Sequence, residues 1–315
     1  MEALRGATIV ITGATGQVGG PLAKSLARDN EVWAIARFSE AGTRDDLEAA
    51  GVHTAKVDLS VGDFSEVPVR PTHVLHFARA NVGQWEPDLA MNVGGVLSLM
   101  EFASGATAFL HCSTTAVYQA TTSTPRFTES AALGDNHRIF ADARSPDIST
   151  YSISKIAAEG AARWGAQRFD VPTVIARICV PYGLDWSWPG YHLDQIVNGQ
   201  PVLVHSDGRT EYNPIHDDDI AATLPGLLAA AAIPAITVNW GGVEVVSIEE
   251  WSTYFGELIG KPVTFERSAE SLKSVSVDTS LMEQLAGPSS VAWKEGFRAI
   301  VEARYPQLLQ EPSQR

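Results

Sequence analysis

The sequence predicts an α/β protein: a doubly wound parallel sheet with a smaller C-terminal domain. Short apolar runs alternate with helical segments, these runs lack polar alternation, and a glycine-rich turn joins the first run to the first helix. Strands without polar alternation are typical of parallel sheets covered by helices on both faces. A chain of 315 residues is long enough for a main domain and a smaller companion.

The first part of the chain supplies the sheet. Its predicted strands are the apolar runs at 7–12, 31–37, 52–59, 72–78, 107–113 and 172–178. Helical patterns lie at 21–29, at 89–103 and from Tyr151 onward. We therefore expect residues 1–180 to form the doubly wound domain.

The pattern loosens after residue 180. The segment 185–192 resembles a loop rich in aromatic residues. A short strand pair is expected within 201–221, and one more strand at 237–242. Amphipathic helices are expected at 247–260 and 291–305. We expect residues 181–315 to form mainly the smaller domain, with a segment near 213–242 returning a strand to the sheet.

Composition narrows the class of protein. The net charge of −14 argues against non-specific binding to nucleic acid or to anionic membranes, because both require basic patches. The two cysteines, Cys112 and Cys179, lie in apolar runs and suit reduced core thiols. No apolar run approaches the length of a membrane span. We expect a cytoplasmic protein.

The first predicted strand runs directly into ITGATGQVGG, with glycines at 13, 16 and 19. Glycines at this spacing, between a strand and a helix, allow a dinucleotide pyrophosphate to approach the backbone and the helix N-terminus. The doubly wound domain is then a Rossmann domain. The loop residues expected to contact the cofactor are Gly13, Thr15, Gly16, Gln17, Val18 and Gly19.

Arg37 follows the second predicted strand, where an acidic residue would bind the ribose of NAD. An arginine there suits the 2′-phosphate of NADP, so NADP is the expected cofactor and NAD the alternative. A solvated arginine at a strand end is the other interpretation. Asp58 ends the third strand, where it either caps a turn or contacts the adenine.

Tyr151 and Lys155 lie four residues apart at the start of an alanine-rich helical segment. Positions i and i+4 share one face of a helix, so the lysine places a positive charge close to the tyrosine hydroxyl. A nearby cation lowers the pKa of a tyrosine and makes it a usable acid or base. An ordinary amphipathic helix is the alternative explanation of an isolated pair.

Together these motifs resemble the extended short-chain dehydrogenase/reductases, also called the NAD-dependent epimerase/dehydratase family. The resemblance spans nearly the whole chain. It is carried by the glycine motif, Asp58-Leu59, His76-Phe77-Ala78, Asn92, CSTTAVY at 112–118, Tyr151-x-x-x-Lys155 and IHDDDIA at 215–221.

The resemblance implies roles for several residues. Tyr151 is the acid/base, Lys155 assists it and contacts the nicotinamide ribose, and Thr114 orients the substrate oxygen, with Ser113 as a possible substitute. Further cofactor contacts implied are Asp58, Leu59, Phe77, Ala78, Arg79, Asn92 and Pro181. The resemblance also implies a homodimer.

Departures from the family concern the substrate. Thr115-Ala116 replaces the Asp-Glu pair of dehydratases, which argues against dehydration. Val180 stands where sugar-nucleotide enzymes carry an asparagine, and Tyr212 where they carry a diphosphate-binding arginine, Arg209 being the nearest arginine. Arg79 replaces a small residue and either meets an anionic group or is solvated.

We therefore expect an NAD(P)-dependent oxidoreductase that interconverts a ketone and a secondary alcohol. The alternatives are an NAD-dependent sugar-nucleotide epimerase and a cofactor-binding regulator without turnover, and the intact Thr114, Tyr151 and Lys155 argue against the regulator. The expected substrate contacts are Thr114, Val180, Trp186 and Arg209, with the aromatic segment 186–192 either closing the pocket or only packing the smaller domain. The histidines and Asp217 to Asp219 match no metal-ligand spacing, so no metal is expected.

Overall fold

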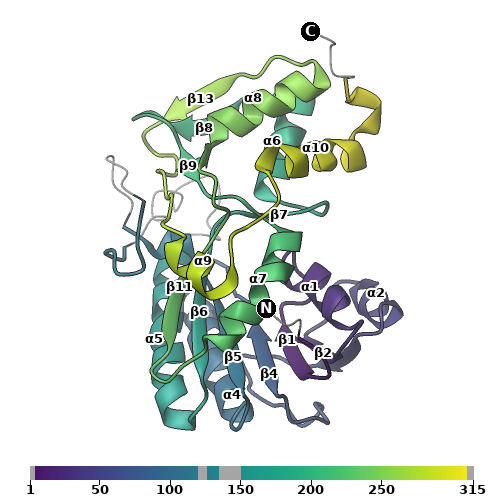
Figure 1. Ribbon diagram of the computed structural model, residues 1–315, viewed down its shortest axis with the longest axis vertical. Coiled ribbons are helices and arrows are strands. Elements are labelled where there is room, and N and C mark those ends of the chain that lie inside the picture. Colours follow the sequence, from purple (N-terminus) through teal and green to yellow (C-terminus); the bar gives the residue numbers. More distant parts are fainter. Residues whose placement is uncertain (1–3, 120–125, 135–149, 311–315) are drawn as a thin grey trace.

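The computed structural model describes residues 4–119, 126–134 and 150–310. Its centre is a seven-stranded parallel sheet in the order β11-β6-β5-β4-β1-β2-β3 (Figure 1). The strands are β1 (Thr8–Thr12), β2 (Glu31–Ala36), β3 (His53–Lys56), β4 (His73–His76), β5 (Ala108–Thr114), β6 (Thr173–Ile178) and β11 (Ile236–Trp240). The strand order reverses between β1 and β4, which is where doubly wound sheets bind ligands. The predicted fold class is confirmed.

Helices cover both faces of the sheet because alternate side chains of each strand point to opposite faces. Along β1, Ile9 and Ile11 belong to one hydrophobic core and Val10 to the other. The first core includes side chains of α1 (Gly19–Leu26), α7 (Asp217–Ala229) and α9 (Ser280–Ala286), and the second those of α4 (Gly95–Phe102) and α5 (Tyr151–Phe169). Helix α2 (Thr43–Ala49) precedes β3.

A third core lies in the upper part of Figure 1. There α8 (Ile248–Ile259) packs against α6 (Trp188–Val197) and α10 (Trp293–Arg304), beside β8 (Val202–His205) and β13 (Phe265–Ser268). Trp251, Phe255 and Phe297 are fully buried at its centre. Helix α8 begins with a capping box in which the Ser247 side chain accepts from Glu250 N and the Glu250 side chain accepts from Ser247 N.

The strand pair expected within 201–221 is wrong, because each strand there finds its partner elsewhere in the chain. β8 pairs in parallel with β13, and β9 (Glu211–Tyr212) pairs antiparallel with β12 (Val246–Ser247). A further short pair joins β7 (Pro181–Tyr182) to β10 (Ile215–His216). These small ladders join the segments after β6 to one another.

Two helices differ from the prediction. The expected loop at 185–192 contains the start of α6, where Ser187 Oγ accepts a hydrogen bond of 3.2 Å from Gly190 N and Pro189 lies in the first turn. The helix expected at 89–103 begins earlier, as α3 (Trp85–Leu89), and passes through a π-helical turn at Ala90–Gly94 before α4. Short 3₁₀ turns lie at Thr115–Val117 and Pro306–Leu308.

None of the helices in the described part of the chain combines the length and apolar character that crossing a membrane requires.

Candidate active site

A cavity of about 1160 Å³ opens at the carboxyl ends of the sheet strands. Its wall comes from the loop between β1 and α1, from the residues that follow β2 to β6, and from the start of α5. The predicted site residues line this cavity except Asn92 and Arg209. Residues that lie far apart in the sequence therefore share one space, which is large enough for a dinucleotide and a substrate.

The glycine-rich loop leaves its backbone open to this cavity. Gly13 has φ +71°, and a Cβ there would lie 2.6 Å from Ala78 N. A Cβ on Gly19 would lie 2.5 Å from Gly13 O, so the third glycine lets α1 begin against the loop. No side chain caps α1 at Val18 and its first turn holds no acidic residue. Its N–H groups can therefore serve a phosphate.

The end of the cavity near β2 and β3 carries charges of both signs. Arg37 and Glu40 line it, as does Asp58. Asp58 Oδ1 accepts bonds of 2.9 Å from Ser60 N and 2.6 Å from Ser60 Oγ. These bonds hold the pKa of Asp58 below its usual range, with a smaller contribution from Arg37 and against a small effect of burial. Asp58 thus caps a turn and faces the cavity.

The predicted catalytic residues meet at the other end. Tyr151 is the first residue of α5, and Lys155 lies one turn later, buried, with Nζ donating a 2.6 Å bond to Cys112 O. Burial lowers the pKa of Lys155. Thr114 Oγ1 accepts a 3.2 Å bond from Ala116 N, which leaves its own hydroxyl proton available.

Ser113, the suggested substitute for Thr114, is held in a buried network. Its hydroxyl donates a 2.6 Å bond to Glu159, which also forms a two-point ion pair with Arg177 at 2.8 and 2.7 Å. Arg177 further donates to Tyr118 OH at 3.0 Å. Thr114 is therefore the freer hydroxyl of the two.

Arg79 lies over the ring of Tyr151, with Cζ 5.1 Å from the ring centroid. This is the geometry of a cation–π contact. The side chain lines the cavity at the end formed by Thr114, Tyr151 and Lys155, the tyrosine end.

Asn92 and Asp88 hold the loop after β4, which lines this end of the cavity, through hydrogen bonds to its backbone. Asn92 Oδ1 accepts from Ala80 N at 2.8 Å, and its amide donates to Ala80 O and to Ser154 Oγ. The fully buried Asp88 accepts from Val82 N and Gly83 N and from Thr150 Oγ1, one residue before Tyr151. Asn92 thus supports the loop rather than lining the cavity. No sequence motif singled out Asp88, because only the fold brings the distant Thr150 to the carboxylate that Val82 N and Gly83 N also reach.

Apolar side chains dominate the remaining wall. Val180, Trp186 and Trp188 line it together with Tyr212, whose hydroxyl donates a 2.9 Å bond to Lys273 O. Val180 adopts φ +43°, although it is β-branched. In the aromatic segment 186–192, Tyr191 lies outside the cavity lining and is 46% exposed.

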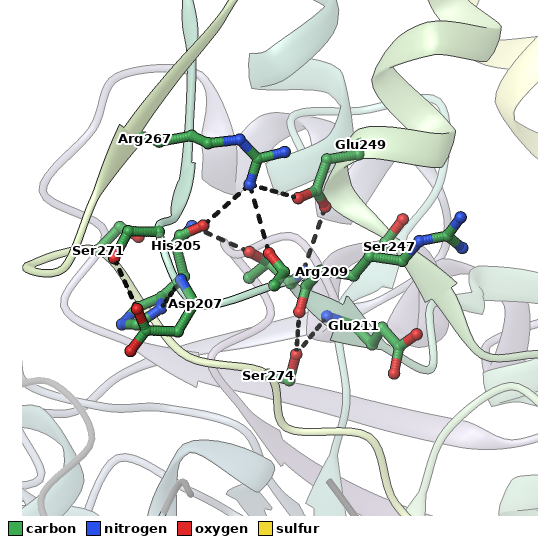
Figure 2. Close-up of polar contacts among 12 residues, drawn as sticks. His205, Asp207, Arg209, Glu211, Ser247, Glu249, Arg267, Ser271 and Ser274 are labelled. Atoms are coloured by element: carbon green, nitrogen blue, oxygen red, sulfur yellow. Dashed lines mark hydrogen bonds and ion pairs between the residues drawn. The ribbon is translucent and has the colours of Figure 1, made fainter. Parts of the chain in front are cut away.

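The structure does not bring Arg209 to the cavity. Its guanidinium forms a 3.1 Å ion pair with Glu250 at the start of α8. Figure 2 shows the backbone around it held by Ser274, whose Oγ donates to Arg209 O at 2.6 Å and accepts from Glu211 N at 2.8 Å. These bonds fasten the loop that carries Leu272 and Val275 into the cavity wall. The structure thus places Arg209, an expected substrate contact, outside the cavity lining, with its guanidinium paired to Glu250.

The acidic run at 217–219 has a structural place in α7. Asp219 is buried and accepts from Ser290 N, Ser290 Oγ and Val291 N, while the His216 side chain caps the helix by accepting from Asp218 N. Among the described residues no cluster of histidine, cysteine, aspartate and glutamate could hold a metal ion.

A family model described as the NAD dependent epimerase/dehydratase family matches residues 9–238. The match spans the glycine-rich loop, Thr114, Tyr151 and Lys155, which the fold brings to one cavity. The chain belongs to this family. It is therefore an enzyme of the NAD-dependent epimerase/dehydratase type.

The chain is also similar to proteins of known description. The chain is 27% identical, over 93% of its length and 97% of the relative's, to the low-salt glycan biosynthesis protein Agl12 of Haloferax volcanii. Two solved structures share the fold. UDP-glucuronic acid 4-epimerase of Bacillus cereus, in complex with UDP-glucuronic acid and NAD, has a TM-score of 0.77 and 21% identity, covering 94% of this chain and 98% of that one. UDP-glucose 4-epimerase of Thermotoga maritima, with UDP-glucose, has a TM-score of 0.77 and 19% identity, and the match covers 95% of this chain and 99% of that one.

The two solved structures carry the names of UDP-sugar 4-epimerases, the class of enzyme that the sequence motifs alone made the second choice. The motifs favour a simple ketone and alcohol oxidoreductase, whereas the relatives support the sugar-nucleotide epimerase alternative better. The Bacillus cereus epimerase is in complex with NAD, whereas Arg37 suggested NADP for this chain.

Proposed function

We propose that this enzyme uses a nicotinamide dinucleotide to oxidise and re-reduce one hydroxyl-bearing carbon of a sugar nucleotide, as an epimerase does. The observation that carries the proposal is the convergence of Thr114, Tyr151 and Lys155 on one wall of the cavity that the glycine-rich loop enters. The family and the described relatives support the substrate class.

The residues fit a dinucleotide. The start of α1 is uncapped, so its N–H groups can serve a pyrophosphate, and the close backbone contacts of Gly13 and Gly19 allow the tight turn that brings the loop to it. When bound, the nicotinamide would supply hydride chemistry. Lys155, Phe77 and Pro181 line the cavity where the family resemblance places the nicotinamide half.

The protein's own groups would handle the proton. Tyr151 would take the hydroxyl proton as the carbon is oxidised and return it on reduction, because its side chain begins α5 at the cavity wall. Thr114 would orient the same oxygen through its free hydroxyl proton. Lys155 would keep a positive charge beside them, buried and fixed by Cys112 O.

We further propose that NADP is preferred over NAD. Arg37 supports this, because it lines the cavity after β2 and forms no ion pair with a described residue. A guanidinium is well suited to a 2′-phosphate. Titration with both cofactors tests the assignment, and equal or stronger binding of NAD would contradict it.

A second candidate is a reductase of a smaller, partly apolar ketone. Val180 and Tyr212 favour it, because apolar and neutral groups occupy cavity positions where the family resemblance implies polar anchors. A buried diphosphate without compensating cations is unfavourable.

Product analysis separates the two candidates, and Tyr151→Phe tests the mechanism they share. An epimerase converts UDP-glucose or UDP-glucuronic acid to its epimer without net change in reduced cofactor, whereas a reductase consumes one reduced cofactor per alcohol formed. Tyr151→Phe removes the transferable proton and should lower turnover about 10²- to 10⁴-fold while cofactor affinity is kept. Near-normal turnover in this variant would contradict the assigned acid/base.

A further inference from the structure

The tyrosine end of the cavity is positively charged in a protein whose net charge is −14. The basic residues that line this end are Arg79 and Lys155, and the lining carboxylates Glu40 and Asp58 lie on segments that follow β2 and β3. Among the described residues, no aspartate or glutamate lines the end formed by Tyr151 and Thr114. An anion in this part of the cavity would meet cations without a competing carboxylate.

Arg79 is the cation that remains available. Lys155 is buried and donates to Cys112 O at 2.6 Å, whereas Arg79 is exposed to the cavity and forms no hydrogen bond or ion pair with any residue that the structure describes. Its guanidinium lies 5.1 Å from the centroid of the Tyr151 ring. A group bound by Arg79 would therefore lie next to the reacting oxygen.

The loop that carries Arg79 is held rigidly. Asn92 bonds both the N–H and the C=O of Ala80, and Asp88 accepts from Val82 N and Gly83 N. Because these bonds fix the backbone around Arg79, less ordering of the loop would accompany binding.

Asn81 adds a second unsatisfied polar group on the same loop. Its side chain lines the cavity, and Oδ1 is buried without a hydrogen-bond donor among the described residues. Buried polar atoms are normally paired, so this acceptor points to a missing donor such as a ligand hydroxyl.

We propose that Arg79 and Asn81 form a subsite for a carboxylate-bearing, hydroxylated substrate, with Arg79 binding the carboxylate close to the carbon that reacts. A guanidinium presents paired donors that match the two oxygens of a carboxylate. The inference rests on the proposed function, because the subsite is defined relative to Tyr151. It selects acids within the substrate class and makes uronate-type sugars better ligands than their neutral counterparts.

Matched ligand pairs test this subsite, because the members of each pair differ only in the acid group. The first pair is UDP-glucuronate and UDP-glucose, which share the same diphosphate, and the second is a 3-oxo acid and its methyl ester. Binding is measured by calorimetry with cofactor present. The acid should bind about 10- to 100-fold more tightly than its neutral partner, the range expected for charge-assisted hydrogen bonds.

Arg79→Gln should remove most of this advantage and leave the affinity of the neutral ligand within about twofold, since a charge-assisted contact is lost only with the acid. Arg298→Gln, which removes an arginine paired with Glu302 on α10, is the charge-matched control and should keep the advantage.

Equal weakening of both UDP-sugars by Arg79→Gln would place Arg79 on the diphosphate and overturn the proposal. An Arg79-dependent advantage for the 3-oxo acid, with neither UDP-sugar bound, would keep the subsite and overturn the sugar-nucleotide function. If no acid shows an Arg79-dependent advantage in either pair, the carboxylate subsite is wrong.

Discussion

At the scale of single residues, Val180 shows how the cavity wall is held under local strain. It is β-branched, precedes Pro181, and adopts φ +43°. β-Branched residues strongly disfavour this left-handed region, and a following proline restricts the backbone further. The surroundings enforce the conformation: Val180 O accepts from Ile215 N at 3.1 Å, and Pro181 O accepts from Gln17 Nε2 at 2.5 Å. Strain of this kind is typical of functional sites.

Val180→Asn should raise the free energy of unfolding by about 1 kcal/mol, because asparagine tolerates the left-handed region far better than valine. Val180→Ala is the control that removes the methyl groups but keeps a residue unsuited to this backbone. Denaturant titration of both variants measures the difference. A loss of stability in Val180→Asn as large as in Val180→Ala would mean that apolar contact, and not strain, dominates at this position.

At the scale of elements, the start of α5 and the loop after β4 are joined by side chains of the helical segment 85–94. Asp88 lies in α3 and Asn92 in the π-helical turn that follows it. Asp88 bonds both the loop, at Val82 and Gly83, and Thr150. Because Arg79 lies on that loop and Tyr151 follows Thr150, one buried carboxylate sets the distance between two sides of the active site.

Asp88→Asn should lower the free energy of unfolding by about 1–3 kcal/mol, because an amide cannot accept on both sides and leaves a buried donor unpaired. Turnover should fall as well, while cofactor affinity changes less, since the glycine-rich loop lies on other elements. Asp63→Asn is the matched control, because Asp63 is an exposed aspartate that accepts from Ser65 N at 2.9 Å. Equal effects of the two substitutions on turnover would show that Asp88 does not position the active-site loop.

At the scale of the whole molecule, buried ionisable groups make stability depend on pH. Burial lowers the pKa of His76 and of His192 to about 3, and places that of His111 well below its usual value. For His76 and His111 the charge of Lys155 acts in the same direction. Burial, with a contribution from Asp185, raises the pKa of Asp217 to about 7.

These shifts predict acid destabilisation between pH 6 and 5. In this range each of the three histidines is neutral when folded and takes up a proton on unfolding, whereas Asp217 is protonated when folded and releases one. The net uptake of about two protons should lower the free energy of unfolding by roughly 3 kcal/mol per pH unit. Urea denaturation at pH 7.5, 6 and 5 measures this slope.

His192→Gln should lower the number of protons taken up on unfolding by about one and make the pH dependence correspondingly shallower. Glutamine does not titrate, and it can still accept the hydrogen bond from Trp251 Nε1. His53→Gln, at an exposed histidine, is the control. Equal stability at pH 6 and pH 5 would contradict the burial of neutral histidines.

The sequence by itself determined the features that local patterns carry. Apolar runs without polar alternation predicted the parallel sheet, and the glycine spacing predicted the loop before α1. The i, i+4 spacing of Tyr151 and Lys155 predicted a shared helix face, and both line the cavity. Each of these features depends on residues that are near one another in the chain, so local pattern suffices.

The tertiary structure alone decided the features that depend on distant partners. Arg209 and Tyr212 lie three residues apart, yet Glu250 engages the Arg209 charge while Tyr212 lines the cavity. The role of Asp88 depends on the fold, which brings the loop after β4 and Thr150 to the same carboxylate. Long-range packing determines which polar groups are paired and which remain available to a ligand, and no local pattern encodes that pairing.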